Sequence, residues 1–341
     1  MILFLNDYSE GAHPRVLEAM ASNNLTQQRG YGLDDISLRA HDKVRALIGC
    51  PEADVHLMTG GTSANLVALT AFLRPHEAVI SADCGHINTH ETGALEGAGH
   101  KILAAPAQAG KLRAEDVRRI VAAHPDEHMV RPRAVFISNA SELGTVYTLA
   151  ELQALRDECD ECGLYLYMDG ARLGSALSSE GCDVAFTDLP GLCDAFYIGG
   201  TKNGALIGEA MVIVNPALKR DFRYILKQRG GMLAKGFLVG QQFDVLMEGS
   251  LYLDIARHAN EMAQIARAAL KARAIPFFVE TVTNQLFPIL TKVQIAYLAA
   301  DFGFQVWEEL PDGRTAIRIV TSWATPEENV RTLADAIAKM P

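Results

Sequence analysis

The segment Ile198-Gly199-Gly200-Thr201-Lys202-Asn203-Gly204 places a lysine directly after an apolar run that begins at Ala195. A lysine at the end of a buried strand is costly unless its charge is paired, neutralised or used chemically. A lysine whose pKa is lowered in such a place can form a Schiff base with a carbonyl group. Taken alone, the segment favours a lysine that reaches solvent from a turn, so the rest of the chain decides between the two interpretations.

Outward from this segment, short apolar runs alternate with helical patterns along most of the chain. This alternation predicts an α/β fold with a mainly parallel sheet sandwiched by helices. Ligands bind at the carboxyl ends of the strands in such sheets. Four polar or glycine-rich features follow predicted strands and are expected to meet there: the segment Gly60–Asn65, the loop Asn139–Gly144, Asp169 and Lys202.

The segment Gly60–Asn65 joins a predicted strand, Val55–Met58, to an apolar helix that opens on Thr62 and Ser63. Glycines allow a close backbone approach, and free N–H groups and the helix dipole favour a phosphate group. Simple capping of the helix explains the two hydroxyl residues equally well. The chain has no GxGxxG pattern, so a dinucleotide site is poorly supported.

Asp169 closes an apolar strand, and Arg172 follows three residues later. A buried carboxylate stays ionised only opposite a cation, and the protonated ring nitrogen of pyridoxal phosphate (PLP) would serve. The planar guanidinium of Arg172 could hold a substrate carboxylate. A local salt bridge between the two residues is an equally open interpretation.

From about residue 251 the pattern changes to a long helix followed by shorter elements, which is typical of a small α+β domain. We therefore predict a large PLP-binding domain with an N-terminal arm over residues 1–250. Residues 251–341 are predicted to form a small C-terminal domain.

Composition excludes several classes of partner. Of 341 residues, 49% are apolar and 21% charged, and the formal net charge of −10 argues against nucleic acid and anionic membranes as partners. The opening MILFL is too short and lacks the basic residues of a signal peptide or membrane span. Six scattered cysteines, with one isolated Cys159-x-x-Cys162 pair, predict free thiols, no metal site and a cytoplasmic location.

In combination, these features resemble the threonine aldolase group of fold-type-I PLP enzymes, within the β-eliminating lyase family. The resemblance covers most of the chain, and DGAR followed by [ST]-K-small-Gly is its most specific part. Its motifs here are Asn6-Asp7, Tyr31-Gly32, Gly60–Leu66, His86 with Glu91, Asp169–Arg172, Thr201–Gly204, Thr283–Phe287 and Ile317–Thr321.

The resemblance implies a role for each matching residue. Lys202 would bind PLP as a Schiff base, Asp169 would pair with the pyridine nitrogen, and His86 would stack on the ring. Without the resemblance, His86 would be interpreted as an ordinary loop histidine and Arg318 as an ordinary arginine on a strand. The anion-binding residues implied are Gly61, Thr62 and Thr201 for the phosphate, and Arg172, Arg318 and Asn6 for the substrate carboxylate.

The chain departs from the group at three positions. Asn6 stands where other members often have serine, and Glu142 where they often have histidine, which is a different kind of base. Leu233 stands where many members have an arginine that reaches the phosphate of a neighbouring subunit. Lys235 and Arg229 are nearby substitutes, so we expect a homodimer or homotetramer with sites completed at the interface.

The implied reaction is retro-aldol cleavage of L-β-hydroxy-α-amino acids such as threonine, allo-threonine and phenylserine to glycine and an aldehyde. His86 or Glu142 is the expected base. Two alternatives stay open: β-elimination or transamination on the same scaffold, and a Rossmann-like NAD(P) oxidoreductase or binding module without PLP.

Overall fold

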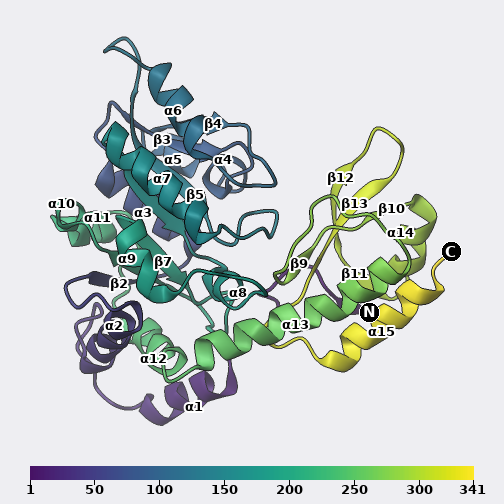
Figure 1. The fold of residues 1–341 in the computed structure, drawn as a ribbon. Coiled ribbons are helices and arrows are strands. Elements are labelled where there is room, and N and C mark those ends of the chain that lie inside the picture. The colour runs from purple at the N-terminus through teal and green to yellow at the C-terminus, as the bar shows by residue number, and fades with distance from the viewer.

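The computed structural model describes residues 1–341 and contains a seven-stranded sheet in the order β2-β8-β7-β6-β5-β3-β4 (Figure 1). Only β8 runs antiparallel to its neighbours, so the prediction of a mainly parallel sheet is confirmed. The strands are β2 (Asp54–Met58), β3 (Glu77–Ala82), β4 (Lys101–Ala105), β5 (Arg131–Ser138), β6 (Tyr165–Asp169), β7 (Ala195–Gly199) and β8 (Glu209–Ile213).

Helices cover both faces of this sheet and form a separate apolar core on each face. The residues of β3, β7 and β8 are all buried, which explains their continuous apolar runs. One face carries α1 (Pro14–Asn23), α2 (Asp35–Ile48), α6 (Ala114–Ala122), α7 (Leu149–Cys162), α8 (Leu173–Leu177), η1 (Phe186–Asp188), α9 (Leu189–Leu192) and α12 (Phe237–Leu246). The other carries α3 (Gly61–Phe72), α4 (His86–Thr89), α5 (Ala94–Gly97), α10 (Pro216–Lys219) and α11 (Phe222–Gln228).

Local sequence fixes where the helices begin and end. Asp34 caps α2 by accepting a hydrogen bond of 2.8 Å from the N–H of Ser37. Thr148 and Glu151 form a capping box at the start of α7, and Gly163 ends that helix in the left-handed region at φ 66°. Helices α4 and α5 are separate, and Gly93 adopts a left-handed conformation directly before α5.

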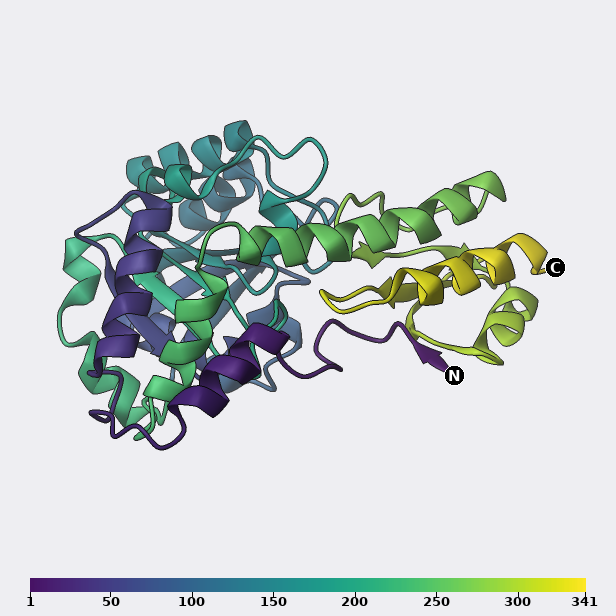
Figure 2. The same cartoon turned by 90° about the horizontal axis from the view of Figure 1, so that it is seen from below.

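The C-terminal part has its own apolar core, and the long helix α13 joins it to the sheet (Figures 1 and 2). The segment Phe277–Glu280 forms no strand, and only Phe277 makes an isolated bridge, with Pro288. The elements are α13 (Leu251–Ala272), β9 (Gln285–Leu286), β10 (Ile289–Leu290), α14 (Lys292–Ala299), β11 (Phe302–Gly303), β12 (Gln305–Glu309), β13 (Thr315–Val320) and α15 (Glu327–Lys339).

The N-terminal arm packs on this C-terminal part rather than on the large sheet. The N-terminal strand lies beside the C-terminal part (Figure 2). Strand β1 (Ile2–Leu3) pairs in parallel with β11, and Phe4 is buried in the C-terminal core. The predicted division between residues 250 and 251 falls at the start of α13 and stays a prediction. No helix combines the length and the apolar character needed to cross a membrane.

Candidate active site

The ends of β2, β6 and β7 bring the predicted cofactor residues to one edge of the sheet. Strand β6 ends at Asp169, and the neighbouring β7 leads directly into the turn that carries Lys202. Strand β2 leads into Gly60 and Gly61, where α3 begins. This arrangement follows from the parallel strands, whose carboxyl ends share an edge.

Asp169 is only 4% exposed and is held by three donors. The side-chain amide of Asn65 donates to it at 2.9 Å, and so does the backbone N–H of Ala171. The hydroxyl of Tyr197 donates to the same carboxylate. Three hydrogen bonds to a buried carboxylate fix its orientation.

His86 is linked to Asp169 through two further side chains. Its Nδ1 lies 2.8 Å from a buried carboxylate oxygen of Glu91, and that oxygen also accepts a hydrogen bond of 2.8 Å from Asn65. Burial lowers the pKa of His86, but the hydrogen bond that it donates to Glu91 and the charges of Glu142 and Asp169 raise the pKa overall above its ordinary value. His86 is therefore a proton donor or acceptor with a fixed ring orientation.

Lys202 is partly buried, and its Nζ lies 5.9 Å from the centroid of the Tyr8 ring. Burial and the nearby charge of Arg172 lower the pKa of Lys202. The backbone of its turn is closed by hydrogen bonds of 3.1 Å from the N–H groups of Gly200 and Thr201 to the carbonyl of Gly208. A lowered pKa makes the lysine nitrogen a better nucleophile at neutral pH.

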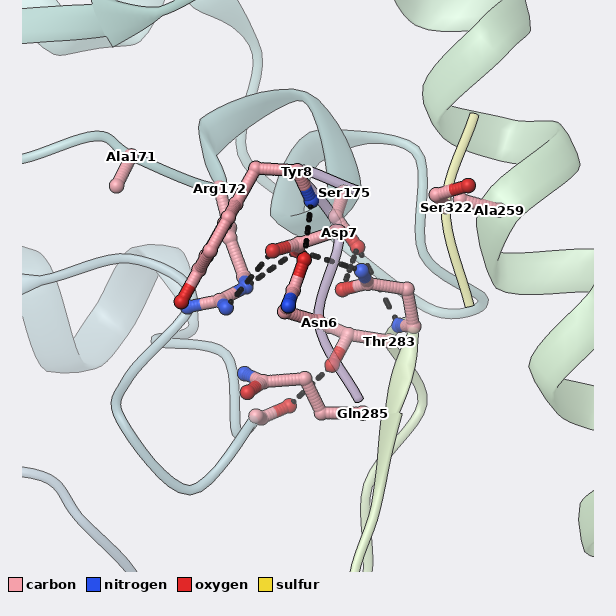
Figure 3. A network of polar contacts seen from close by, with 12 residues as sticks. Asn6, Asp7, Tyr8, Ala171, Arg172, Ser175, Ala259, Thr283, Gln285 and Ser322 are labelled. Atoms are coloured by element: carbon pink, nitrogen blue, oxygen red, sulfur yellow. Dashed lines mark hydrogen bonds and ion pairs between the residues drawn. The ribbon is translucent and has the colours of Figure 1, made fainter. Parts of the chain in front are cut away.

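Arg172 does not pair with Asp169, so the interpretation as a local salt bridge is wrong. Its Nε and Nη2 donate to the two carboxylate oxygens of Asp7 at 2.7 and 3.0 Å (Figure 3). Both side chains are buried, and Asn284 donates a further hydrogen bond to Asp7 at 2.9 Å. Arg172 therefore keeps only Nη1 without a partner in the chain, toward which a substrate carboxylate could be oriented.

Arg318 has no carboxylate partner in the chain. Its Nη1 donates to Gln285 at 3.4 Å and its Nη2 to Gln305, while its Nε is buried without a partner. Its guanidinium carbon lies 5.4 Å from the centroid of the Trp307 ring. Burial and the charge of Arg172 lower the pKa of Arg318. An uncompensated guanidinium with an unpaired N–H fits an anionic ligand group.

The phosphate-binding residues predicted from sequence surround the start of α3. Gly60 provides no side-chain cap, so the first N–H groups of α3 are free for an anion. A Cβ at Gly61 would lie 3.0 Å from the hydroxyl of Tyr197, so glycine allows the close packing found here. Thr62 is exposed, whereas the hydroxyl of Thr201 accepts a hydrogen bond of 3.1 Å from the N–H of Gly208.

The remaining predicted site residues are Glu142, Asn6 and Lys235, and each has a different environment. Glu142 is buried after β5 and accepts a hydrogen bond of 3.4 Å from Ser138. The side-chain oxygen of Asn6 accepts hydrogen bonds from Tyr8 N–H and the Ser9 hydroxyl at 2.9 and 3.0 Å, which leaves its amide group free. Lys235 is exposed in a hollow beside α1 and makes no hydrogen bond or ion pair with the other site residues.

A cleft of about 1010 Å³ lies between the loops of the sheet and the C-terminal part. His90, whose ring centroid is 5.6 Å from that of His86, lines one side. Trp307 and Phe278 line the opposite side, and Leu143 follows Glu142 in the chain. The cleft therefore adjoins His86, Glu142 and Arg318, although none of these three residues lines it.

Asp7, Asn65, Tyr197 and Glu209 complete the site, yet the sequence analysis gave none of them a defined role. Asp7 was visible only as part of the Asn6-Asp7 motif. Glu209 opens an apolar strand, and a charged residue in a continuous buried strand was the available signal. Asn65 ends the segment Gly60–Asn65 and lies one turn of α3 after Gly61.

Comparison with known proteins now identifies the family. The model of the β-eliminating lyase family matches residues 4–292. The chain belongs to the β-eliminating lyase family. It is 34% identical over 334 residues to a low-specificity L-threonine aldolase of Pseudomonas aeruginosa, covering 97% of this chain and 95% of that protein. The corresponding protein of Escherichia coli is 30% identical over 213 residues, 61% of this chain and 62% of that protein.

Solved structures agree with this family. A threonine aldolase of Leishmania major is 46% identical, with a TM-score of 0.98 over 99% of this chain and 98% of that one. An aspartate aminotransferase of Thermus thermophilus, at 16% identity, has a TM-score of 0.74 over 99% and 91% of the two chains. The second likeness shows the fold alone, and the predicted fold-type-I architecture is confirmed.

The residues present fit PLP, the cofactor that this family predicts. Free N–H groups at the start of α3 suit a phosphate, and Asp169 suits a protonated ring nitrogen. Lys202 has the lowered pKa that Schiff-base formation requires. The cofactor prediction is therefore supported by the family and by the chemistry of the donor set.

Proposed function

We propose that this protein is a PLP-dependent aldolase that cleaves L-β-hydroxy-α-amino acids to glycine and an aldehyde. The observation that carries the proposal is the placement of Lys202, Asp169 and the uncompensated Arg318 around one edge of the sheet. The related proteins named threonine aldolases support the same reaction.

Each residue has a defined task in this proposal. Lys202 binds PLP covalently, Asp169 binds its ring nitrogen, and the free N–H groups at Gly61 and Thr62 bind its phosphate together with Thr201. PLP supplies an electron sink for the bond that breaks at the substrate α-carbon. Arg318, with Nη1 of Arg172 and the amide of Asn6, binds the substrate carboxylate and so decides which α-carbon bond is aligned for cleavage.

Removal of the β-hydroxyl proton requires a base beside the cleft. His86 is the first candidate, because Glu91 holds its Nδ1 and leaves Nε2 free to take up a proton. Glu142 is the second, since it is buried nearby and its charge acts on both His86 and His90. In this proposal His86 would also stack on the cofactor ring.

The cleft supports substrates larger than threonine. A threonine side chain would occupy a small part of about 1010 Å³, whereas the aryl group of phenylserine could contact Trp307, Phe278 and Leu143. Phenylserine-type substrates therefore belong to the proposal beside threonine and allo-threonine.

We further propose a homodimer or homotetramer in which a neighbouring subunit completes the site. Lys235 and Arg229 are exposed and free to reach the phosphate of a neighbour. Exposed apolar side chains, among them Leu25 and Leu206, suit a contact between copies. Six free cysteines agree with the proposed cytoplasmic location.

The test is a panel of threonine, allo-threonine and phenylserine, assayed for glycine and aldehyde with PLP-loaded wild-type protein and Lys202→Ala. We expect equal amounts of glycine and aldehyde from the wild type and none from the variant. Ammonia with a keto acid would instead support β-elimination. A keto acid formed only with an added amino acceptor would support transamination.

A further inference from the structure

Glu209 is a buried carboxylate directly behind the lysine turn. It is 3% exposed, and its Oε2 accepts a hydrogen bond of 2.8 Å from the N–H of Gly200. It opens β8 and pairs with Gly199 of β7 on one side and Met58 of β2 on the other. Glu209 therefore lies between β7, which leads to Lys202, and β2, which leads to Gly60 and Gly61 at the start of α3.

No cationic side chain forms an ion pair with Glu209 in the structure, which is unusual for a buried carboxylate. The charged groups acting on it are Lys202, which favours its ionised form, and Asp169, which opposes it. Its negative charge also acts on three buried tyrosines, Tyr167 and Tyr197 of the sheet and Tyr252 of α13. Burial raises the pKa of Glu209 to about 7, against hydrogen bonds from Thr201 and Gly200.

The turn beside Glu209 has little room for other side chains. A Cβ at Gly200 would lie 2.6 Å from the carbonyl oxygen of Gly208 and 2.9 Å from the ring of Phe243. Any residue with a Cβ would therefore displace the turn at Gly200, and the carboxylate of Glu209 supplies the side-chain acceptor for the Gly200 N–H. The position of Lys202, two residues further on, depends on this packed turn.

We propose that Glu209 is a positioning residue for Lys202, which holds the Gly200–Lys202 turn and stabilises positive charge on the lysine nitrogen. The inference rests on the proposed function of Lys202 as the PLP-binding lysine. A negative charge close to a protonated nitrogen favours the protonated form. Arg172 opposes protonation of Lys202, whereas Asp7, Glu142 and Asp169 favour it. Glu209 adds to the effect of these three carboxylates where it is ionised, above about pH 7.

The experiment is a pH titration of the visible absorbance of the PLP-loaded protein, comparing wild type with Glu209→Gln. Glutamine keeps the size of the side chain and an oxygen that accepts from Gly200, but it removes the charge. We expect the midpoint of the titration to fall by about one pH unit in Glu209→Gln, the effect of losing one nearby charge. Glu209→Asp keeps the charge and should titrate within a few tenths of a unit of the wild type.

Glu77→Gln is a matched control, because Glu77 is 6% exposed and accepts a hydrogen bond of 2.8 Å from the N–H of Arg74 at the opposite end of the strands. It should titrate as the wild type does. An unchanged midpoint in Glu209→Gln would overturn the inference, and so would equal shifts in Glu209→Asp and Glu209→Gln. A wild-type protein without any borohydride-sensitive absorbance would overturn the proposed function itself, and the inference with it.

Discussion

The two arginines proposed to bind the substrate carboxylate differ in their partners within the chain. Arg172 is held on two of its nitrogens by Asp7, whereas Arg318 has only amide oxygens as partners and an unpaired buried Nε. Because Arg172 is already neutralised, Arg318 supplies most of the charge that is available to a substrate carboxylate.

Arg318→Gln should therefore weaken substrate binding. Loss of a hydrogen bond to a charged group costs about 1.5–3 kcal/mol, which corresponds to roughly a tenfold to hundredfold fall in kcat/KM. Steady-state kinetics with threonine measure this effect. Arg314→Gln, which removes an exposed arginine paired with Asp312, is the control and should leave the kinetics unchanged. Equal kinetics of Arg318→Gln and wild type would contradict this role.

Asp7→Asn should destabilise the protein as a whole. Removing one partner of a buried ion pair costs about 3–5 kcal/mol, because Arg172 would be left buried without a counter-charge. Urea unfolding at neutral pH measures the loss, and Asp42→Asn, in an exposed pair with Arg45, is the control. A loss below about 1 kcal/mol, the size of a surface pair, would contradict the importance of this pair.

The Asp7 pair also has a defined pH dependence. Burial alone would raise the pKa of Asp7, but Arg172 and Lys202 lower it below the ordinary value of 3.8. The stabilisation is therefore fully present above about pH 3.8 and is lost as the pH falls through the lower folded pKa.

At the scale of elements, β12 forms one wall of the cleft and carries Trp307 and Gln305. Trp307 packs edge-on against Phe287, at 5.1 Å between ring centroids, and lies against Arg318. Strand β12 thus presents an apolar surface to the cleft and contacts the Arg318 guanidinium, which we propose binds the substrate carboxylate.

Trp307→Ala should change substrate preference. The apolar contact with an aryl group is lost, whereas the methyl group of threonine is too small to make a comparable contact with Trp307. We expect kcat/KM for phenylserine to fall about tenfold relative to threonine, which corresponds to about 1.4 kcal/mol. The ratio of the two substrates is the measurement, with Tyr224→Ala, an exposed aromatic residue on α11, as the control. An unchanged ratio would show that the β-substituent lies elsewhere.

Sequence patterns predicted the strand ends well, because apolar runs followed by glycine or a single charged residue are local signals. Gly61, Asp169 and Lys202 were found in this way. The partners of these residues were not, because they come from distant parts of the chain: Asp7 lies 165 residues from Arg172, and Asn65 lies 104 residues from Asp169. The pairing of β1 with β11 was also missed. The two strands lie near opposite ends of the chain, and each has only two residues, which is too short a pattern to indicate a partner.

At the scale of the whole molecule, Glu209 makes stability depend on pH. The pKa of Glu209 rises from 4.5 to about 7 on folding. Its contribution to the free energy of unfolding is therefore fully present below about pH 4.5 and is lost as the pH rises through about 7. Within that window the free energy of unfolding of the wild type should fall by about 1.4 kcal/mol per pH unit relative to that of Glu209→Gln. Denaturant unfolding of both proteins between pH 4.5 and 8 measures the difference. A constant difference across this range would contradict the raised pKa.

Covalent binding of PLP by Lys202 is the central claim, and reduction with borohydride tests it most directly. The PLP-loaded protein would be reduced, digested and analysed by mass spectrometry, with Lys202→Ala treated in parallel. The account predicts one pyridoxyl-modified peptide, the one containing Lys202, and no modified peptide from the variant. Specific modification of another lysine, or an equal yield of modified protein from Lys202→Ala, would contradict it.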